Sequence, residues 1–293
     1  MFQNLIAQGL VKEKKYPNGL SVFKYSREVF YKALWNTDPL LLEARGMVLD
    51  AEGNKVIWPF TKVFNYNENG TTLDPLTMVV CPRKVNGFMA SVTRYRDEIL
   101  VSTTGTLDSD YVGYAKEMLA PLDLDYVTAG YTFLFEIVHP KDPHIIEEEF
   151  GAYLIGCRRH ATGGMAHELG LDNVASQMGA KRPEVIFGYF KDILDYLKEC
   201  KHEGYMVRLE GSEETVMKLK SPHYLTKKFL MRMGKNKVEY MFNEKEEFLK
   251  NTDEEFYGVV NHITRFFTME DWKARDDVAR RAIIEEFFEN TQR

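Results

Sequence analysis

Proline and glycine are unevenly distributed along this chain, and their distribution separates two kinds of structure. From residue 223 to residue 293 there is no proline, and the only glycines are Gly234 and Gly258. Apolar residues recur there every three or four positions, for example between residues 278 and 287, which is the spacing of one face of a helix. The chain is therefore predicted to end in a small helical module, which we place at residues 226–293.

The sequence before this module reads as short strands separated by turns. The strand candidates are rich in β-branched and aromatic residues and are bounded by Gly, Pro, Asn or Asp. They cover residues 46–50, 54–60, 87–96, 98–105, 131–138, 152–159, 204–211 and 215–221. Helices are expected over 110–119 and 183–200, where apolar residues follow helical spacing. The predicted fold is α+β: residues 1–225 form antiparallel sheets flanked by helices, followed by the all-α module.

The composition is that of a globular protein, with 44% hydrophobic and 28% charged residues. No apolar run approaches the ~20 residues that a membrane helix needs, and the first residues do not resemble a signal peptide. The three cysteines are widely spaced, which fits a reducing, cytoplasmic compartment better than a disulfide framework. Because the net charge is −6, any binding of nucleic acid requires a local basic patch.

Three lysines lie in apolar, strand-like segments of the sequence, where a lysine that only faces solvent is not expected. Lys84 lies in C-P-R-K-V-N-G-F, between an apolar run and a strand. Lys218 and Lys220 lie in T-V-M-K-L-K-S, two positions apart, so they point to the same face of a strand while Met217 and Leu219 face the core. Two adjacent ammonium groups repel each other unless an anion lies between them, and a phosphate is well suited to this.

Two acids stand in equally apolar surroundings. Glu136 ends the run F-L-F-E, and Glu203 opens H-E-G-Y-M-V-R. An acid inside an apolar strand is usually paired or coordinates a metal. Lysines and carboxylates delivered by separate strands are what nucleotidyl transfer requires: an amine attacks a phosphate, carboxylates hold a metal ion, and further lysines neutralise the developing charge.

Four motifs occur in order: K-V-N-G (84–87), F-L-F-E (133–136), E-G-Y-M-V-R (203–208) and M-K-L-K-S (217–221). Together they resemble the motif series of the covalent nucleotidyltransferases, which include ATP-dependent DNA ligases, RNA ligases and capping guanylyltransferases. One such motif alone would be weak, because chance matches are common. Four in order, each on an expected strand, are specific.

Upstream residues narrow the resemblance, which covers about residues 20–225. E-A-R-G-M-V-L-D (43–50) and P-F-T-K-V-F-N-Y-N-E (59–68) are similar to the segment before the nucleophile in bacteriophage RNA ligase 1-like enzymes, and more loosely in fungal tRNA ligases. The stretch D-E-I-L-V-S-T-T-G (97–105) also fits these enzymes. Residue Asn86 stands where the commoner motif has Asp, as it does in the fungal enzymes, and this removes one carboxylate near the lysine.

The resemblance implies a role for each matched residue. Lys84 would carry AMP, and Glu203 would hold the catalytic metal, Mg²⁺ or Mn²⁺. Glu136 would bind the ribose of ATP or a metal-bound water. The other nucleotide contacts implied are Tyr25, Arg45, Lys62, Lys218 and Lys220, of which Arg45 and Lys62 would contact the departing pyrophosphate. Adenine would lie between residues 152–156 and apolar residues near Val207.

Each of these residues also has a structural reading. Taken alone, Lys84 is an ordinary surface lysine, Lys218 and Lys220 are the solvated face of an edge strand, and Glu136 pairs with a nearby arginine. Arg45 could cap a turn, and Tyr25 is a packing residue if the resemblance is set aside. Only the occurrence of all four motifs together favours the functional reading.

The resemblance implies an ATP-dependent RNA ligase that joins 5′-phosphate and 3′-hydroxyl ends through a lysyl-AMP and an adenylylated RNA end, as in tRNA repair. It is expected to act as a monomer. The alternatives are a DNA ligase, a capping-type enzyme, or a non-catalytic RNA-binding protein on the same fold. DNA ligases and capping enzymes usually carry a β-barrel after the last motif, whereas this tail reads as helical. The basic segment 218–237, rich in Lys and Arg without any acid, is a candidate RNA track.

Overall fold

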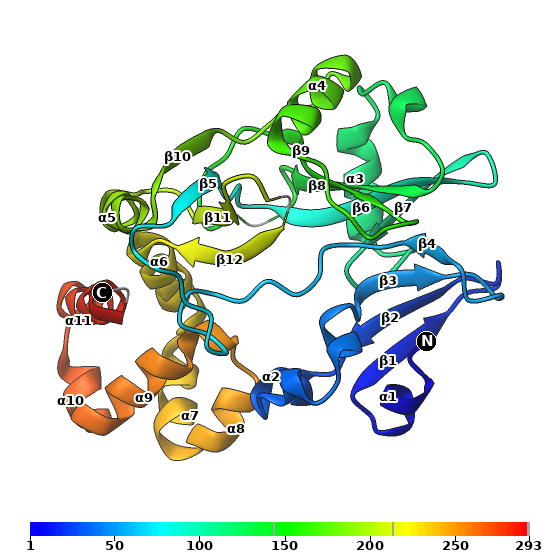
Figure 1. Ribbon diagram of the computed structural model, residues 1–293. Helices are drawn as coiled ribbons and strands as arrows, with labels where there is room; N and C mark the ends of the chain where they lie inside the picture. The colour runs from blue at the N-terminus through cyan, green and yellow to red at the C-terminus, as the bar shows by residue number, and fades with distance from the viewer. Residues whose placement is uncertain (143, 213, 292–293) are drawn as a thin grey trace.

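The computed structural model describes residues 1–142, 144–212 and 214–291, and the chain forms three four-stranded antiparallel sheets with helices around them (Figure 1). The predicted α+β class is confirmed. The sheets have the strand orders β1-β2-β3-β4, β10-β5-β11-β12 and β7-β6-β8-β9. Each sheet is covered on at least one face by apolar side chains of a neighbouring element, so the cores are local rather than one continuous interior.

The N-terminal sheet consists of β1 (Val11–Lys15), β2 (Ser21–Tyr25), β3 (Arg45–Leu49) and β4 (Lys55–Ile57). Its inner face packs against the short helices that surround it, with Trp35 and Leu41 in the core. These helices are α1 (Gln3–Ala7), α2 (Arg27–Tyr31), η1 (Leu34–Asn36) and η2 (Pro39–Leu42). Other buried apolar residues of this sheet, among them Val22 and Val48, pack against Tyr95 and Leu100. This contact joins the N-terminal sheet to the sheet β7-β6-β8-β9.

The sheet β7-β6-β8-β9 is built from long strands and packs on the largest apolar core of the described residues. It consists of β6 (Phe88–Tyr95), β7 (Glu98–Thr103), β8 (Tyr131–Val138) and β9 (Gly151–Arg159). The helices α3 (Asp110–Leu119) and α4 (Glu168–Met178) cover one face, and η3 (Leu124–Tyr126) closes the edge. β8 is buried along almost its whole length, which explains its nearly unbroken apolar sequence.

The third sheet consists of β5 (Met78–Pro82), β10 (Val185–Tyr189), β11 (Gly204–Leu209) and β12 (Thr215–Lys220), packed on α5 (Phe190–Glu199). The prediction of one helix over 183–200 is therefore wrong in its first part. Residues 185–189 pair with β5 in an antiparallel register, because V-I-F-G-Y offers β-branched and aromatic side chains to a sheet edge, and the helix begins only at Phe190.

The other strand predictions correspond to observed strands within a few residues, and the helix predicted over 110–119 is α3. The strand predicted over 54–60 is shorter, because β4 ends at Ile57 and Pro59 lies beyond it. The strands β1, β2 and β5 were not predicted. β1 and β2 are only five residues long and are interrupted by lysines, and β5 is an equally short apolar run that ends at a proline, so periodicity alone gives a weak signal.

The C-terminal helices form a separate apolar core that includes Phe229, Phe256 and Phe288. They are α6 (Pro222–Arg232), α7 (Lys235–Asn243), α8 (Lys245–Lys250), η4 (Glu254–Phe256), α9 (Tyr257–Phe266), α10 (Met269–Ala274) and α11 (Asp277–Thr291). The predicted boundary at 225/226 falls inside α6, and Tyr224 and Leu225 already belong to this core. None of the helices in the described residues is both long and apolar enough to cross a membrane.

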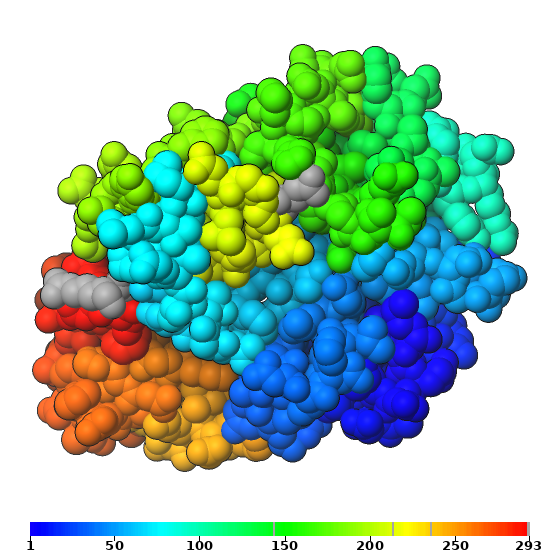
Figure 2. Space-filling model, in the orientation of Figure 1, coloured from blue at the N-terminus to red at the C-terminus, as the bar shows by residue number. Residues whose placement is uncertain are grey.

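The helical module touches the rest of the chain at several places. The Tyr31 hydroxyl of α2 donates to Glu246 of α8 at 3.1 Å, and Arg27 donates to Asn251 at 3.4 Å. On another side, the Asn67 side chain donates to the carbonyl oxygen of Thr291 at 3.3 Å. In the space-filling view the module accordingly lies against both the N-terminal unit and the segment that follows it (Figure 2).

Candidate nucleotide site

Lys84 lies in the loop between β5 and β6, held between strands of two sheets. Its backbone N–H donates to the carbonyl oxygen of Gly204, at the start of β11, at 2.8 Å. Three residues later, Gly87 approaches β8 so closely that an added Cβ would lie 2.2 Å from the carbonyl oxygen of Ile137. The last position of K-V-N-G must therefore be glycine for lack of space. Because both ends of the loop are fixed, the position of the lysine is fixed as well.

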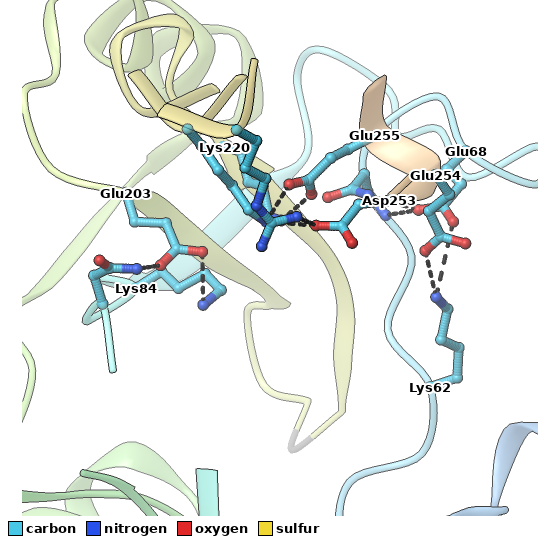
Figure 3. A network of polar contacts seen from close by, with 12 residues as sticks. Lys62, Glu68, Lys84, Glu203, Lys220, Asp253, Glu254 and Glu255 are labelled. Atoms are coloured by element: carbon cyan, nitrogen blue, oxygen red, sulfur yellow. Dashed lines mark hydrogen bonds and ion pairs between the residues drawn. The ribbon is translucent and has the colours of Figure 1, made fainter. Parts of the chain in front are cut away.

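The Lys84 amine is paired with a buried carboxylate (Figure 3). Its Nζ lies 2.9 Å from Oε1 of Glu203, and the other oxygen of Glu203 accepts a hydrogen bond from Nδ2 of Asn86 at 2.8 Å. Burial opposes the charged form of both partners. The carboxylates of Glu203 and Glu136 nevertheless raise the pKa of Lys84, and the charges of Lys84 and Lys220 lower the pKa of Glu203. The pair is therefore ionised.

Glu136, at the end of β8, is the second carboxylate beside the amine. Its Oε1 accepts a hydrogen bond from the backbone N–H of Gly87 at 3.2 Å. Burial raises the pKa of Glu136 to about 7, and the negative charge of Glu203 raises it further, whereas the positive charge of Lys84 lowers it. Burial of the carboxyl group therefore favours its neutral form.

Most of the predicted site residues line one cavity of about 380 Å³. Arg45, Lys84, Glu136, Glu203, Lys218 and Lys220 all contribute to its wall. The lining also includes the apolar residues Phe60, Val63, Met89, Ile155, Pro183 and Met206. A wall that combines charged and apolar groups suits a nucleotide. Ile155 lies within the strand predicted to contact adenine, whereas Val207 is fully buried and its neighbour Met206 lines the wall instead.

The β12 lysines are arranged as the alternation of a strand predicts. Met217 and Leu219 are buried in the core of the third sheet, and Lys218 and Lys220 both line the cavity. Burial lowers the pKa of Lys218 well below its ordinary value, and the neighbouring charges of Lys220, Lys62 and Arg45 lower it further. The side chain of Lys220 pairs with Glu255 of the helical module, so the anion expected beside these lysines is a carboxylate of the same chain.

Two predicted nucleotide contacts, Lys62 and Tyr25, do not line this cavity. The Nζ of Lys62 lies 2.6 Å from Oε1 of Glu254 and 4.6 Å from the centre of the Trp35 ring. Tyr25 packs edge-on against the same tryptophan, with ring centres 4.9 Å apart. Tyr25 therefore packs against Trp35, as expected for a packing residue, and does not line the cavity.

Sequence reasoning missed Lys228, Glu254 and Glu255. Lys228 lines the cavity from α6 and is only 8% exposed, and Glu255 accepts from both Lys220 and Lys228. The three consecutive acids at 253–255 gave a local signal of negative charge in the sequence. Their contacts with lysines 27, 35 and 192 residues earlier depend on the tertiary fold, which no local pattern encodes.

The basic segment 218–237 is partly neutralised in this arrangement. Lys220, Lys228 and Arg232 are engaged by Glu255 and Asp253. Lys227 and Lys237 are exposed, and the side chain of Lys235 lies outside the described residues. Its role as an RNA track stays a prediction.

The site can be compared with known proteins. No protein-family model matches the chain, and no curated protein does. Among solved structures, one form of an archaeal ATP-dependent RNA ligase superposes with a TM-score of 0.62 at 15% identity, covering 97% of this chain and 74% of the ligase. A putative ATP-dependent DNA ligase from Aquifex aeolicus superposes with a TM-score of 0.61 at 12% identity, covering 98% of this chain and 76% of that one. The chain has the nucleotidyltransferase fold of ATP-dependent ligases. Because the superposition covers nearly the whole chain, it extends past residue 225, where the sequence motifs end.

Proposed function

We propose that the protein is an ATP-dependent RNA ligase whose nucleophile is Lys84. The observation that supports this most directly is the Lys84 amine, which is fixed between Glu203 and Glu136 in a cavity that also holds Lys218, Lys220 and Arg45. The ligase fold is compatible with this chemistry, but the proposal depends on the residues of the site.

In the first step, Nζ of Lys84 attacks the α-phosphorus of ATP. A nitrogen–phosphorus bond forms, the bond from the α-phosphorus to the bridging oxygen breaks, and pyrophosphate leaves. The amine must first give up its proton to solvent, and the Glu203 carboxylate opposes this loss because it stabilises the charged amine. Entry of cationic charge beside Glu203 and Glu136 weakens that stabilisation, and Lys218 and Lys220 offset the charge on the phosphate.

Glu203 and Glu136 would hold a divalent metal ion, Mg²⁺ or Mn²⁺. Carboxylate oxygens are the ligands that such hard cations take, and both carboxylates line the same cavity. The metal would supply charge neutralisation of the phosphates. Glu203 also positions the nucleophile, and Asn86 positions Glu203.

In the next two steps, AMP passes from Lys84 to an RNA 5′-phosphate, and a 3′-hydroxyl attacks the activated end. The strand is sealed and AMP is released. The helical tail favours an RNA ligase over DNA ligases with a C-terminal β-barrel, since residues 226–291 contain helices and no strand. We further propose that residues 1–225 form the adenylylation unit and that the substrate is a broken RNA such as a cleaved tRNA. A DNA ligase is the second candidate, because the chain superposes on a putative ATP-dependent DNA ligase about as well as on the archaeal RNA ligase.

The test is intact-mass spectrometry after incubation with ATP and Mg²⁺ or Mn²⁺. The expected result is a mass increase of one AMP in the wild type and none in Lys84→Ala. Absence of an adduct with ATP, GTP or NAD⁺ would contradict the proposal and favour a non-catalytic RNA-binding protein. Ligation of matched RNA and DNA strands with 5′-phosphate and 3′-hydroxyl ends then separates the two ligase readings.

A further inference from the structure

The helical module inserts three consecutive acids into the cationic end of the site (Figure 3). Asp253, Glu254 and Glu255 lie at η4, in the turn between α8 and α9, which we call the acidic turn. Each of the three carboxylates contacts at least one lysine. Two of these lysines, Lys62 and Lys220, are among those that the sequence predicts to bind the phosphates of ATP.

The contacts of Glu255 lie on the cavity wall. Its carboxylate accepts from Lys220 of β12 and, at 2.5 Å, from Lys228 of α6. Lys228 also lies 3.0 Å from Asp253. The Glu255 side chain is only 8% exposed, and the lysine charges hold its pKa below the ordinary value although burial opposes this. The carboxylate is therefore ionised and takes the place of an anion between two cations.

Glu254 makes the equivalent contact on the neighbouring side. Its Oε1 lies 2.6 Å from Nζ of Lys62, and Glu68 lies 3.8 Å from the same amine. Lys218 and Lys220 line both the nucleotide cavity and a second cavity of about 290 Å³, whose wall includes Glu254 and Glu255. The acidic turn thus contributes Glu254 and Glu255 to a cavity that shares Lys218 and Lys220 with the nucleotide cavity.

These ion pairs are costly to bury and are weak evidence of stability, because desolvation of each charge offsets most of the attraction. An apolar turn would hold the module to the sheet at least as well. The three carboxylates resemble a phosphate chain in charge, because they present anionic oxygens to several lysines at hydrogen-bonding distance. The same lysines cannot bind a carboxylate and a phosphate oxygen in the same place.

We propose that the acidic turn 253–255 occupies the site of the β- and γ-phosphates of ATP, so that ATP must displace it, and that Lys228 is a further phosphate-binding residue. This inference rests on the proposed function. The turn is a competitor built into the chain, and the apparent affinity for ATP is reduced by the fraction of molecules in which the turn is seated. In the protein without ATP, the acidic turn therefore occupies the lysines that would otherwise bind the phosphates, which are Lys62, Lys220 and Lys228.

The first test compares the ATP concentration at half-maximal lysyl-AMP formation in wild type, Glu255→Gln and Glu239→Gln. Glu239 is an exposed acid of the same module that pairs with Lys273, so its variant controls for the loss of one charge. Removing the competing carboxylate is expected to lower the half-saturating ATP concentration about tenfold, whereas Glu239→Gln leaves it unchanged. An unchanged or higher value in Glu255→Gln would overturn the inference.

Because Glu255→Gln leaves two lysines without their carboxylate, its folding is checked by thermal unfolding. Asp253→Asn is the milder second variant, since the Asp253 side chain is 44% exposed, and it is expected to shift ATP affinity in the same direction. Lys228→Met should weaken binding of inorganic tripolyphosphate in calorimetry. Unaltered binding by a folded Lys228→Met variant would refute the role of Lys228.

The second test follows displacement of the turn directly. Wild-type protein is mixed with an α,β-methylene analogue of ATP, which cannot transfer AMP, and hydrogen exchange is measured over residues 245–266. Faster exchange in the acidic turn is expected on binding; unchanged or slower exchange would mean that the turn stays seated.

The outcomes also separate this inference from the proposed function. If the wild type forms lysyl-AMP but Glu255→Gln leaves its ATP dependence unchanged, the inference fails and the function stands. If neither protein forms an adduct while Glu255→Gln binds tripolyphosphate more tightly than wild type, the ligase function fails and the covered phosphate site stands.

Discussion

Nζ of Lys84 lies 2.9 Å from a carboxylate oxygen of Glu203, and this pair is the centre of the site. The carboxylate that positions the amine also keeps it protonated. If Lys84 is the nucleophile, as we propose, its attack on a phosphate requires that other cations replace the amine beside Glu203. The arrival of substrate charge would then release the nucleophile.

Asn86 fixes Glu203 from the opposite side, and its replacement tests that contact. Its Nδ2 donates to Glu203, while its Oδ1 accepts from the backbone N–H groups of Ile145 and Ile146, each at 3.0 Å. Asn86→Asp keeps the acceptor but places a second carboxylate against Glu203. We expect a loss of about 2 kcal/mol in the free energy of unfolding, measured in urea. A variant as stable as wild type would show that Asn86 does not hold Glu203.

Gly204 is required by backbone geometry where the Lys84 loop meets β11. Its φ is +139°, and a Cβ there would lie 2.0 Å from the carbonyl oxygen of Leu219. Gly204→Ala is expected to cost about 3 kcal/mol or more in unfolding free energy. The control is Gly113→Ala in α3, where nothing lies within 4 Å of the added methyl group and stability should rise by up to about 1 kcal/mol. Equal effects of the two variants would contradict the geometry.

Removal of divalent metal should abolish transfer of AMP to Lys84. Treatment with EDTA is expected to slow adduct formation by at least about a hundredfold, since the metal supplies several kcal/mol of charge stabilisation, and added Mg²⁺ or Mn²⁺ should restore it. Glu203→Gln should raise the metal concentration needed, while the exposed Asp195→Asn should not. Full activity in EDTA would exclude the metal site.

The pairing of Glu255 makes the stability of the helical module depend on pH. The charges of Lys220 and Lys228 hold the folded-state pKa of Glu255 below its unfolded value, so the carboxylate stabilises the folded state above the unfolded pKa. This contribution is lost as the pH falls through the acid range. Because the unfolded-state pKa of a Glu carboxyl is about 4.5, the urea midpoint should fall more in wild type than in Glu255→Gln between pH 5 and pH 3, whereas the two proteins should change in parallel between pH 7 and pH 5. If the two proteins lose stability in parallel over the lower range as well, Lys220 and Lys228 do not lower the pKa of Glu255.

The local chemistry of the site could be predicted from sequence. The alternation M-K-L-K places Lys218 and Lys220 on one face and their apolar neighbours in the core, and this holds in the structure. The apolar runs before Glu136 and after Glu203 predicted strands with a polar end, which are β8 and β11. The partial error at 183–200 has a local cause as well: V-I-F-G-Y has apolar residues at positions that suit either a helix or a strand, and pairing with β5 decided for the strand.

What the sequence determined by itself is the class of fold, the motif residues and the helical character of the tail, because these follow from side-chain period and composition within short windows. What only the tertiary structure decided is which charges meet. Tyr25 is next to Trp35 rather than in the cavity, and Glu255 reaches Lys220 across the sheet and the module. Such pairings depend on the packing of distant elements, whose geometry is set by the summed burial of many side chains and leaves no pattern near the residues themselves.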